Sequence, residues 1–447
     1  MSNDIIDEAR SRLELCITAD DGDRALALDD LKFRKGEQWD EQSARQRELD
    51  SRPCFTINNI PAICHQVTND IRQNRQSIHV HPVSEGANQD VAEVMEGLIR
   101  HIEYDSGADA AYDTALDYTV TMGFGYFRLV TEYCSPTSNE QNMKIKRVRN
   151  PFTIYLDPSI QEADGSDAMF GFVTTKMPKK EFTRTYPSKD PTIDYLAKGA
   201  GDDENWLGED FVRICEYYRI EEKADKLIQL SNGKTQLVSD ETPLEPGVEI
   251  VMENGKVKQR DTLTRKVMWY KLTAKEVLES AEVPFDWIPL FPVFGDEIDI
   301  DGKVCRSGLV RYAKDPKRME NFWLTSATEE IALRTKTPFI GAIGQFEGVE
   351  EDWAEANLRN FNYLEYNPVT VDGTLAPPPV RQPTADVPAG FIAMAGLAGD
   401  KVKAVTGIYD ASLGNRSNET SGIAIKARQH QGDVGNFHFA DNFTRPS

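Results

Sequence analysis

The sequence of 447 residues is poor in cysteine and holds no paired cysteine motif. Its six cysteines stand apart, and none forms the Cys-x-x-Cys spacing of zinc sites and redox centres. In a chain of this size, scattered cysteines favour reduced thiols in a core over disulfides or metal ligands. We therefore expect no metal, no cofactor and no disulfide framework.

Long apolar runs are also missing. No stretch approaches the ~18 apolar residues of a membrane span, and the first residues, MSNDIIDEARSRLELC, are charged rather than signal-like. We expect a chain that is made in the cytoplasm and has no membrane partner.

Positive charge is scarce. There are 51 Lys and Arg residues against 73 Asp and Glu residues, a net charge of −22. An acidic surface repels phosphate backbones and argues against tight wrapping of nucleic acid. It is compatible with a surface that DNA slides past without sticking, and equally with acidity that serves solubility alone.

Two stretches of the sequence are similar to phosphate-binding motifs, but neither is complete. Gly233-Lys234-Thr235 is similar to the end of a P-loop, but Ile228 stands where the motif needs glycine. Gly123-Phe124-Gly125 is half of a dinucleotide fingerprint and precedes an expected strand, so a tight helix-to-strand turn is the better interpretation.

Catalytic and metal-binding constellations are not evident either. His79 and His81 form the one close histidine pair, without a third ligand nearby. The acidic run 347–355 is typical of a solvated helical face anchored by Trp353. A further hypothesis is an enzyme with a β-rich body, which would need a catalytic cluster that we do not find in the sequence. We therefore expect that the protein is not an enzyme.

The first third of the sequence is predicted to be helical. Residues 4–35 indicate a helix broken near 20–22, and residues 59–76 a second helix, followed by a strand at 77–83. Residues 88–120 indicate one long helix. Its apolar stripe consists of Val91, Met95, Leu98 and Ile102.

The middle of the sequence is predicted to be mostly β. Between 144 and 305 the apolar runs are short and rich in β-branched and aromatic residues. Asn232-Gly233 and Asn254-Gly255 separate such runs and predict hairpin turns.

The last third returns to helix. Asp315-Pro316 offers a helix cap, and the stripe that follows is Met319, Phe322, Trp323, Ala327 and Ile331. A compact insert ends in the stiff proline-rich linker TLAPPPVRQP, and a second helix begins at Pro388. Its apolar face comprises Phe391, Ala395, Ala398, Val402 and Val405.

Two helices of matched length with an insert between them form an antiparallel hairpin with a tip. One such hairpin cannot bury both of its faces by itself. Copies placed side by side around a ring would cover them, and the polar loop after the second helix would then lie at the inner mouth of the hairpin.

Several stretches, in this order, resemble the portal proteins of tailed bacteriophages, in the branch of short-tailed phages (podoviruses). The resemblance covers nearly the whole chain. The stretches are FRKGEQWDEQ, RPCFTINNIPAICHQVTNDIRQNR, YTVTMGFGYFRLVTEY, NPFTIYLDPS, VFGDEIDIDGKVCRSGLVRYAKDPKRMENFW, TGIYDASLGNRSNETSGIAIKARQHQGD and FHFADNF.

The resemblance implies an α+β fold with an α/β wing, an antiparallel helical stem and a small α/β clip, in a ring-forming oligomer. The wing would be helical to about 120 and β-rich over 121–305. The remaining parts would be the stem helices 306–335 and 387–407, the clip 336–386, the channel loop 408–420, and a returning helix over 421–447, with the family's crown further on.

The implied function is a head-to-tail connector: a ring, typically of twelve subunits, at one capsid vertex, through which double-stranded DNA is packaged and ejected. The implied partners are the terminase large subunit, the major capsid and scaffolding proteins, and tail adaptors. The implied location is the virion, with assembly in the host cytoplasm. The alternative is another ring-shaped head-to-tail adaptor or a minor capsid structural protein.

The implied site residues fall on the loop and the helices. The channel loop would present Asn415, Arg416, Ser417 and Asn418 to DNA, because a single cation on a mobile loop can touch phosphate and release it. A solvated loop residue or a salt bridge between subunits is the alternative for Arg416. Further residues are a basic belt of Lys401, Lys403, Lys426 and Arg428, stem packing by Met319, Phe322, Trp323, Ile331, Phe391 and Val402, and Trp353 in the clip.

Overall fold

A computed structural model describes residues 2–75, 77–83, 88–189, 211–231, 233–239, 249–253, 256–273, 275–332, 338–356, 358–382, 389–408 and 435–445. The chain divides into two compact units. The first unit comprises Met1–Glu37, Asn58–Ala313 and Thr406–Ser447, and the second comprises Gln38–Ile57 and Lys314–Val405. Residues 38–57 thus group with the helix pair near the C-terminus rather than with the flanking N-terminal sequence.

The first unit contains a long N-terminal helix, α1, at Ser2–Lys35. The expected break near 20–22 is wrong: the helix runs through Gly22 without interruption. A glycine inside a helix costs only about 1 kcal/mol, and α1 buries apolar side chains on both sides of it, including Leu13 and Phe33. The other helices of this unit are α3 (Ile60–Gln73), α4 (Gln89–Ser106), α5 (Ala108–Met122), α6 (Lys179–Thr185) and α11 (Phe437–Thr444).

The single helix expected over 88–120 is also wrong. Gly107 adopts a left-handed conformation with φ of 58° and ends α4, and α5 begins at the next residue. Most of the stripe expected to face a core is exposed, with Val91 at 56%, Met95 at 52% and Leu98 at 55%. The strand expected at 77–83 does not form in that described segment.

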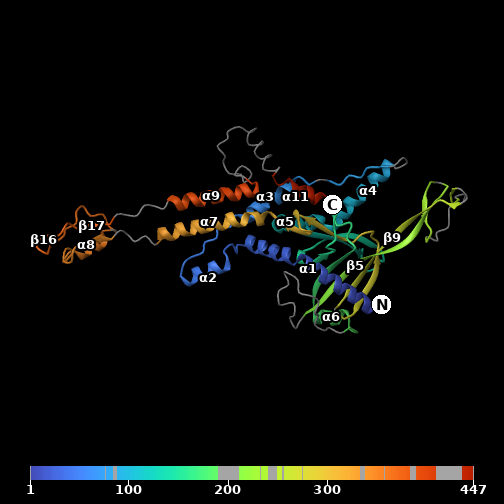
Figure 1. Cartoon of the computed structure of the whole chain (residues 1–447), viewed down its shortest axis with the longest axis horizontal. Helices are drawn as coiled ribbons and strands as arrows, with labels where there is room; N and C mark the ends of the chain where they lie inside the picture. Colours follow the sequence, from blue (N-terminus) through green and yellow to red (C-terminus); the bar gives the residue numbers. More distant parts are fainter. Residues whose placement is uncertain are drawn as a thin grey trace. The chain divides into compact units, whose positions relative to one another are not determined.

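Two antiparallel sheets form the centre of the first unit (Figure 1). The first has the order β11-β1-β2, from Leu290–Phe294, Phe124–Tyr133 and Gln141–Arg147. The second has the order β10-β9-β5-β4-β3, with β6 paired to β5. Its strands are β3 (Ile154–Leu156), β4 (Phe170–Pro178), β5 (Phe211–Gln229), β6 (Thr235–Leu237), β9 (Gln259–Leu272) and β10 (Val277–Val283). The mixed α and β composition is as expected.

Three hairpins extend from these sheets or stand beside them. β5 pairs antiparallel with β6, and β7 (Met252–Glu253) pairs antiparallel with β8 (Lys256–Val257), as the two predicted hairpins require. Of the predicted turn residues, Gly233 has a positive φ of 82°, and Asn232, Asn254 and Gly255 lie outside the described residues. The third hairpin, β12 (Asp296–Ile300) with β13 (Lys303–Ser307), pairs with no other described strand.

The turn from α5 into β1 is confirmed as a glycine turn. Gly123 ends the helix with φ of 99°, and a Cβ on it would lie 2.7 Å from the Ser307 backbone. A Cβ on Gly125 would lie 2.0 Å from the Ala115 carbonyl oxygen. Both glycines therefore allow backbones to approach where no side chain fits.

Two of the buried clusters in the first unit position its sheets, and a smaller third one consists of Phe182, Val212 and Ile214. The first cluster packs the first sheet against the second, with Phe124, Tyr126, Ile154, Val173 and Tyr218 among its buried members. The second cluster lies between α1 and the second sheet, with Leu13, Cys16, Phe172, Tyr217 and Tyr270. The buried guanidinium of Arg24 on α1 donates to the carbonyl oxygens of Phe152 and Ile154, which fastens the helix to this sheet.

The second unit consists of short elements around two long helices. They are α2 (Glu41–Leu49), most of α7 (Leu309–Ala332), β14 (Phe339–Ile340), α8 (Glu350–Glu355), β15 (Thr370–Val371), β16 (Thr374–Leu375), β17 (Val380–Arg381) and α9 (Ala389–Thr406). None of the described helices of either unit is both long and apolar enough to cross a membrane.

The cap expected at Asp315 is wrong. Helix α7 begins at Leu309, so Pro316 lies inside the helix. Proline there removes one backbone hydrogen bond. The first turn nevertheless stays helical because Leu309, Val310 and Ala313 are buried.

Candidate functional site

Helix α7 carries a ladder of polar side chains on one face. Lys317, Asn321, Thr325 and Glu329 are spaced by four residues, so they line one side of the helix. Their exposed fractions are 0%, 1%, 0% and 7%. The most buried face of α7 in the second unit is therefore polar.

Residues 38–57, which we call the strap, satisfy most of this ladder. The Asn321 side chain donates to Gln38 Oε1 at 2.7 Å and accepts from the backbone N–H of Ile57 at 3.1 Å. The N–H of Phe55 donates to Thr325 Oγ1 at 3.3 Å. The strap thus supplies the hydrogen-bond partners that buried polar groups require.

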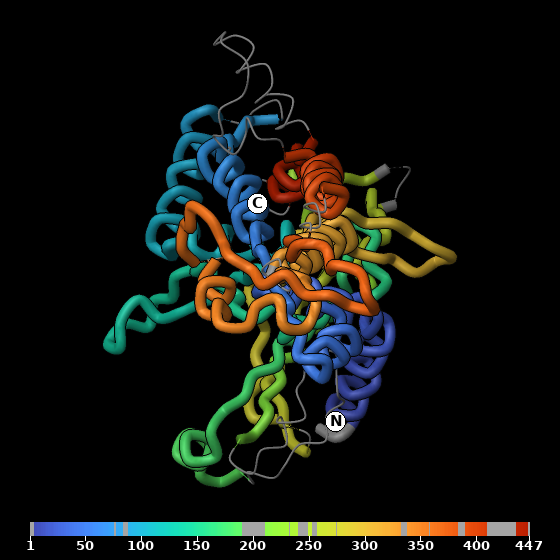
Figure 2. The backbone as a smooth tube through the Cα atoms, turned by 90° about the vertical axis from the view of Figure 1, so that its left-hand side faces the viewer, coloured from blue at the N-terminus to red at the C-terminus, as the bar shows by residue number. Residues whose placement is uncertain are grey.

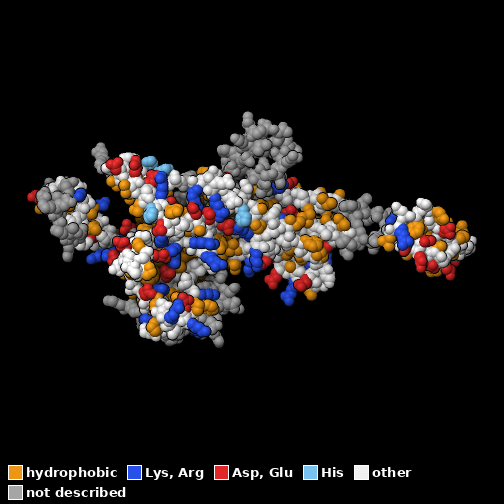
Figure 3. Space-filling model, turned by 180° about the vertical axis from the view of Figure 1, so that it is seen from behind, with side chains coloured by type: hydrophobic (Ala, Val, Ile, Leu, Met, Phe, Trp, Pro, Cys, Tyr) orange, Lys and Arg blue, Asp and Glu red, His pale blue; other side chains and the backbone are white. Residues whose placement is uncertain are grey.

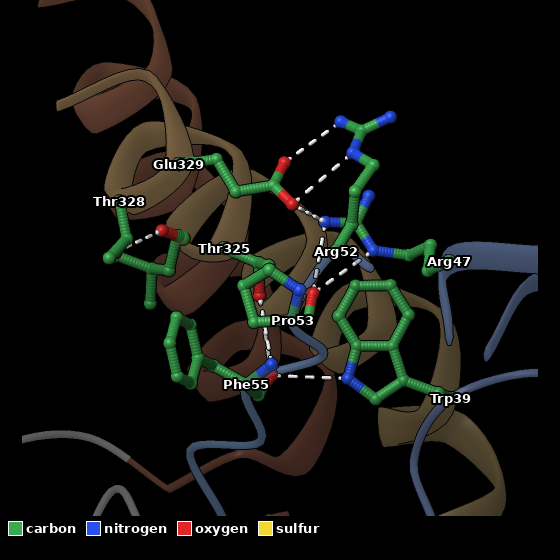
Figure 4. Close-up of polar contacts among 9 residues, drawn as sticks. Trp39, Arg47, Arg52, Pro53, Phe55, Thr325, Thr328 and Glu329 are labelled. Carbon is green, nitrogen blue, oxygen red and sulfur yellow. Dashed lines mark hydrogen bonds and ion pairs between the residues drawn. The ribbon is translucent and has the colours of Figure 1, made fainter. Parts of the chain in front are cut away.

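Two arginines of the strap converge on Glu329 (Figure 4). Arg47 Nη2 lies 2.6 Å from Glu329 Oε1, and Arg52 Nη2 lies 2.8 Å from Oε2. Arg47 also donates to the carbonyl oxygen of Pro53 at 3.0 Å and lies over the Trp39 ring. Hydrogen bonds from Arg52 and then Arg47 lower the pKa of Glu329 from its usual 4.5, so the carboxylate stays charged.

The apolar stripe that the sequence predicts on α7 lies mostly on an exposed side of the helix. Met319, Phe322 and Ile331 are exposed by 47%, 44% and 52%. Trp323 is half-buried. Apolar side chains of α9 are exposed as well, with Ile392 at 53% and Leu397 at 52%. Figure 3 shows hydrophobic side chains scattered over the surface of this helical region.

Helices α7 and α9 lie side by side in opposite directions (Figure 1). The rings of Trp323 and Phe391 are 5.5 Å apart, and Glu320 lies beside Gly399. Since the earlier residue of α7 meets the later residue of α9, the pair is antiparallel. The buried residues of α9 are the apolar Ala395, Ala398 and Val402, and Thr406 at its end.

Trp353 is the centre of a small aromatic cluster in the segment that follows α7 and precedes α9 in the sequence. Its ring lies 4.9 Å from Phe339 and 5.1 Å from Phe346, and its Nε1–H donates to the Glu365 carbonyl oxygen at 2.6 Å. Glu350, Glu351 and Asp352 of α8 are exposed, and Glu355 is half-buried. This segment therefore has its own anchor and an acidic surface.

The expected DNA-contacting residues are only partly described. Lys401 is exposed, and Lys403 lies 3.8 Å from Asp400. Asn415, Arg416, Ser417, Asn418, Lys426 and Arg428 lie outside the described residues. Within the described ranges, no three His, Cys, Asp or Glu side chains gather in a way that could hold a metal ion.

Sequence reasoning missed the polar ladder and the strap that covers it. The signal was present as the four-residue spacing of Lys317, Asn321, Thr325 and Glu329. This spacing did not predict a buried face, because the usual sign of a buried face is an apolar stripe, and the same helix has one.

The second unit thus presents a helix pair, α7 and α9, whose outer apolar side chains are exposed in the single chain. The family model described as "Phage P22-like portal protein" matches residues 10–446, and the chain belongs to this family. P22 is a podovirus, so the resemblance to the short-tailed branch is confirmed. Portal proteins are structural components of the virion and are not enzymes.

The chain is similar to the portal protein of Acyrthosiphon pisum secondary endosymbiont phage 1. The two are 25% identical over 449 aligned residues, which cover 94% of this chain and 61% of the relative. The chain therefore spans about 61% of the length of that relative.

Proposed function

We propose that copies of this chain assemble into a closed ring of about twelve subunits around a channel for double-stranded DNA. The ring occupies one vertex of the capsid, and the genome is packaged and ejected through it. Family membership supports this proposal, and the exposed apolar surface of α7 and α9 is the single observation that carries it.

The physical reason for assembly is that one face of α7 is covered within the chain and another is not. Its polar ladder is occupied by the strap through Gln38, Phe55, Ile57 and the arginines. Phe322 and Ile331 are then left to solvent in a single chain. Side chains of this size each gain about 1.5–3 kcal/mol on burial, and a neighbouring copy of the helix pair would bury them.

We propose the following parts of the portal. Helices α7 and α9 belong to a stem formed by residues 306–335 and 387–407. The segment 336–386, with Trp353 at its centre, is the clip that docks the terminase large subunit and later the tail adaptors. The two-sheet unit forms the wing, which meets capsid and scaffolding proteins. The loop 408–420 lines the channel.

The test is the native mass and the electron-microscopic appearance of the purified protein. Wild-type chain is expected to form rings with a central channel. Phe322→Asp should shift it to monomers, because a carboxylate replaces an apolar contact. Thr328→Asp, at an exposed position of the same helix, is the matched control and should keep the rings. A wild-type monomer at micromolar concentration would contradict the proposal.

A further inference from the structure

A groove lined by cations lies at the base of the β1–β2 hairpin. The hairpin (teal) projects from the first unit in Figure 2, and the groove is at the other end of its two strands, where Arg147 is opposite Phe127. The groove has a volume of about 520 Å³, and its charged lining residues are Arg128, Arg147, Arg149 and Lys176. Among the described residues no Asp or Glu lines it, although the chain has a net charge of −22.

The groove exists because strand β4 is longer than its neighbour β3. Pairing between the two strands stops at Val173, opposite Ile154, whereas β4 stays paired with β5 as far as Pro178. The part of β4 that extends past β3 therefore has no described strand on that edge, and it forms one wall of the groove. Residues 147–150, which follow β2 in the sequence, form the other wall.

The backbone on either side of the two groove arginines of residues 147–150 is fixed by hydrogen bonds. Arg147 is held in the ladder between β1 and β2. The carbonyl oxygen of Arg149 accepts a hydrogen bond from the Tyr118 hydroxyl at 2.9 Å. Asn150 caps the short 3-10 helix that follows, because its side chain accepts the N–H of Phe152 at 3.1 Å. A ligand therefore meets arginines on an ordered backbone, which lowers the entropic cost of binding.

Arg147 and Arg149 carry the charge that is open to a ligand. Both are exposed, and within the described part of the chain neither guanidinium has an ion-pair or hydrogen-bond partner. Arg128 is different, because it is paired with Glu216 at 3.3 Å, and Lys176 has a partner as well. Guanidinium groups bind carboxylates and phosphates through paired N–H donors, so the two arginines indicate an anion site.

The exposed lining of the groove is polar throughout. The apolar lining residues, Val148, Ile154 and Val173, are exposed by only 7%, 0% and 4%. A protein partner would need an apolar or aromatic anchor at the centre of the interface, and no described residue of the groove provides one. Charged, amide and hydroxyl side chains are instead the groups that contact the sugar–phosphate backbone of nucleic acids. The exposed lining residues are of these kinds: Arg147, Arg149, Asn150, Thr175 and Lys176.

We propose that this groove binds the phosphate backbone of double-stranded DNA through Arg147 and Arg149. The choice of double-stranded DNA rests on the proposed function, but the site is additional to the proposed channel loop and is complete in one chain. Two phosphate contacts make a weak site that does not read the base sequence. The acidity of the rest of the chain keeps the affinity low, so that DNA is held and released.

The test is the salt dependence of DNA binding by the purified full-length chain. Fluorescence anisotropy of a short labelled duplex of arbitrary sequence gives the association constant at a series of salt concentrations. Each phosphate contact contributes about 0.9 to the slope of the logarithm of this constant against the logarithm of the salt concentration. Arg147→Gln with Arg149→Gln should therefore lower the slope by about 1.8 and weaken binding by about tenfold at about 0.1 M salt.

Lys258→Gln with Arg260→Gln is the matched control. These two cations are also exposed and two positions apart, at the start of β9, but they do not line the groove. The slope should stay unchanged in this variant. Arg147→Lys with Arg149→Lys should keep most of the binding, since a point charge still neutralises a phosphate. All three variants should unfold at the wild-type temperature, because the changed side chains are exposed.

The results separate this site from the proposed ring. A wild type that does not bind the duplex, or a Gln variant with an unchanged slope, would refute the site and leave the ring standing. An equal effect of the control pair would show that DNA responds to net charge alone. Loss of rings in the Gln variant with unchanged DNA binding would assign the groove to carboxylates of a neighbouring copy. The expected slope change in a wild type that forms no rings would support the site and remove the ring alone.

Discussion

Glu329 of α7 and Arg47 of α2 form a buried ion pair at 2.6 Å, with 8% and 10% of their side chains exposed. The two residues are 282 positions apart in sequence. The contact ties the N-terminal strap to the helix pair formed much later in the chain. It also determines which side of α7 remains available to another molecule.

Glu329→Gln is expected to release the strap from α7. The change leaves the buried guanidinium of Arg47 without its counter-charge, and breaking such a pair costs about 3 kcal/mol. The measurements are the denaturant-induced free energy of unfolding and hydrogen exchange in residues 38–57. Arg52→Ala removes a partner that is 52% exposed and should cost less than about 1 kcal/mol. Equal losses in both variants would contradict this account.

The same pair predicts a pH dependence. Hydrogen bonds from Arg52 and Arg47 lower the pKa of Glu329 in the folded state below its usual 4.5. The pair therefore contributes its stability above about pH 4.5 and loses it as the pH falls through the lowered pKa. Between about pH 6 and pH 3, wild type should lose more free energy of unfolding than Glu329→Gln. Parallel curves for the two proteins would argue against an ionised Glu329.

Trp323→Ala is expected to reduce ring yield more than Trp353→Ala. Truncating a packed tryptophan costs about 3–5 kcal/mol, and Trp323 lies on the proposed stem, against Phe391. Trp353 packs within its own segment, against Phe339 and Phe346, so its loss should loosen the clip locally. The comparison uses native mass spectrometry at matched concentrations. If both variants lower ring yield equally, the stem has been assigned wrongly.

Replacing residues 413–419 by a Gly-Ser linker is expected to leave rings intact and impair DNA packaging or retention. The segment holds almost no apolar side chain, so ring stability should draw little from it. Arg416→Ala alone should be milder, because one phosphate contact is weak and screened by salt. The readout is the count of DNA-filled heads beside ring yield in a phage complementation assay. Loss of rings would give Arg416 a structural role between subunits instead.

Gly125→Ala is expected to destabilise the first unit strongly. The added Cβ would lie 2.0 Å from the Ala115 carbonyl oxygen, so β1 and α5 would have to separate. Overpacking of this kind costs about 1–3 kcal/mol or more. Gly97→Ala is the control: no atom lies within 4 Å of its added Cβ on α4, and it should stabilise by about 0.5–1 kcal/mol. Thermal unfolding of both variants makes the comparison.

The sequence by itself determined the local structure that depends on the conformational preferences of a few neighbouring residues. Glycine turns at Gly123 and Gly233 follow from backbone freedom, and the β-rich middle follows from short apolar runs between turn residues. The order of motifs was enough to identify the family. These features need no knowledge of distant contacts.

Only the tertiary structure decided which faces are buried. The stripe on α4 and the stripe on α7 have the periodicity of core faces, yet Leu98 and Phe322 are exposed in the single chain. A helix buries the face for which the rest of the fold supplies partners. For α7 those partners are Gln38, Phe55 and Arg47, hundreds of residues away. The periodicity of a sequence shows which face of a helix is apolar. Whether the same chain covers that face depends on where the strap packs.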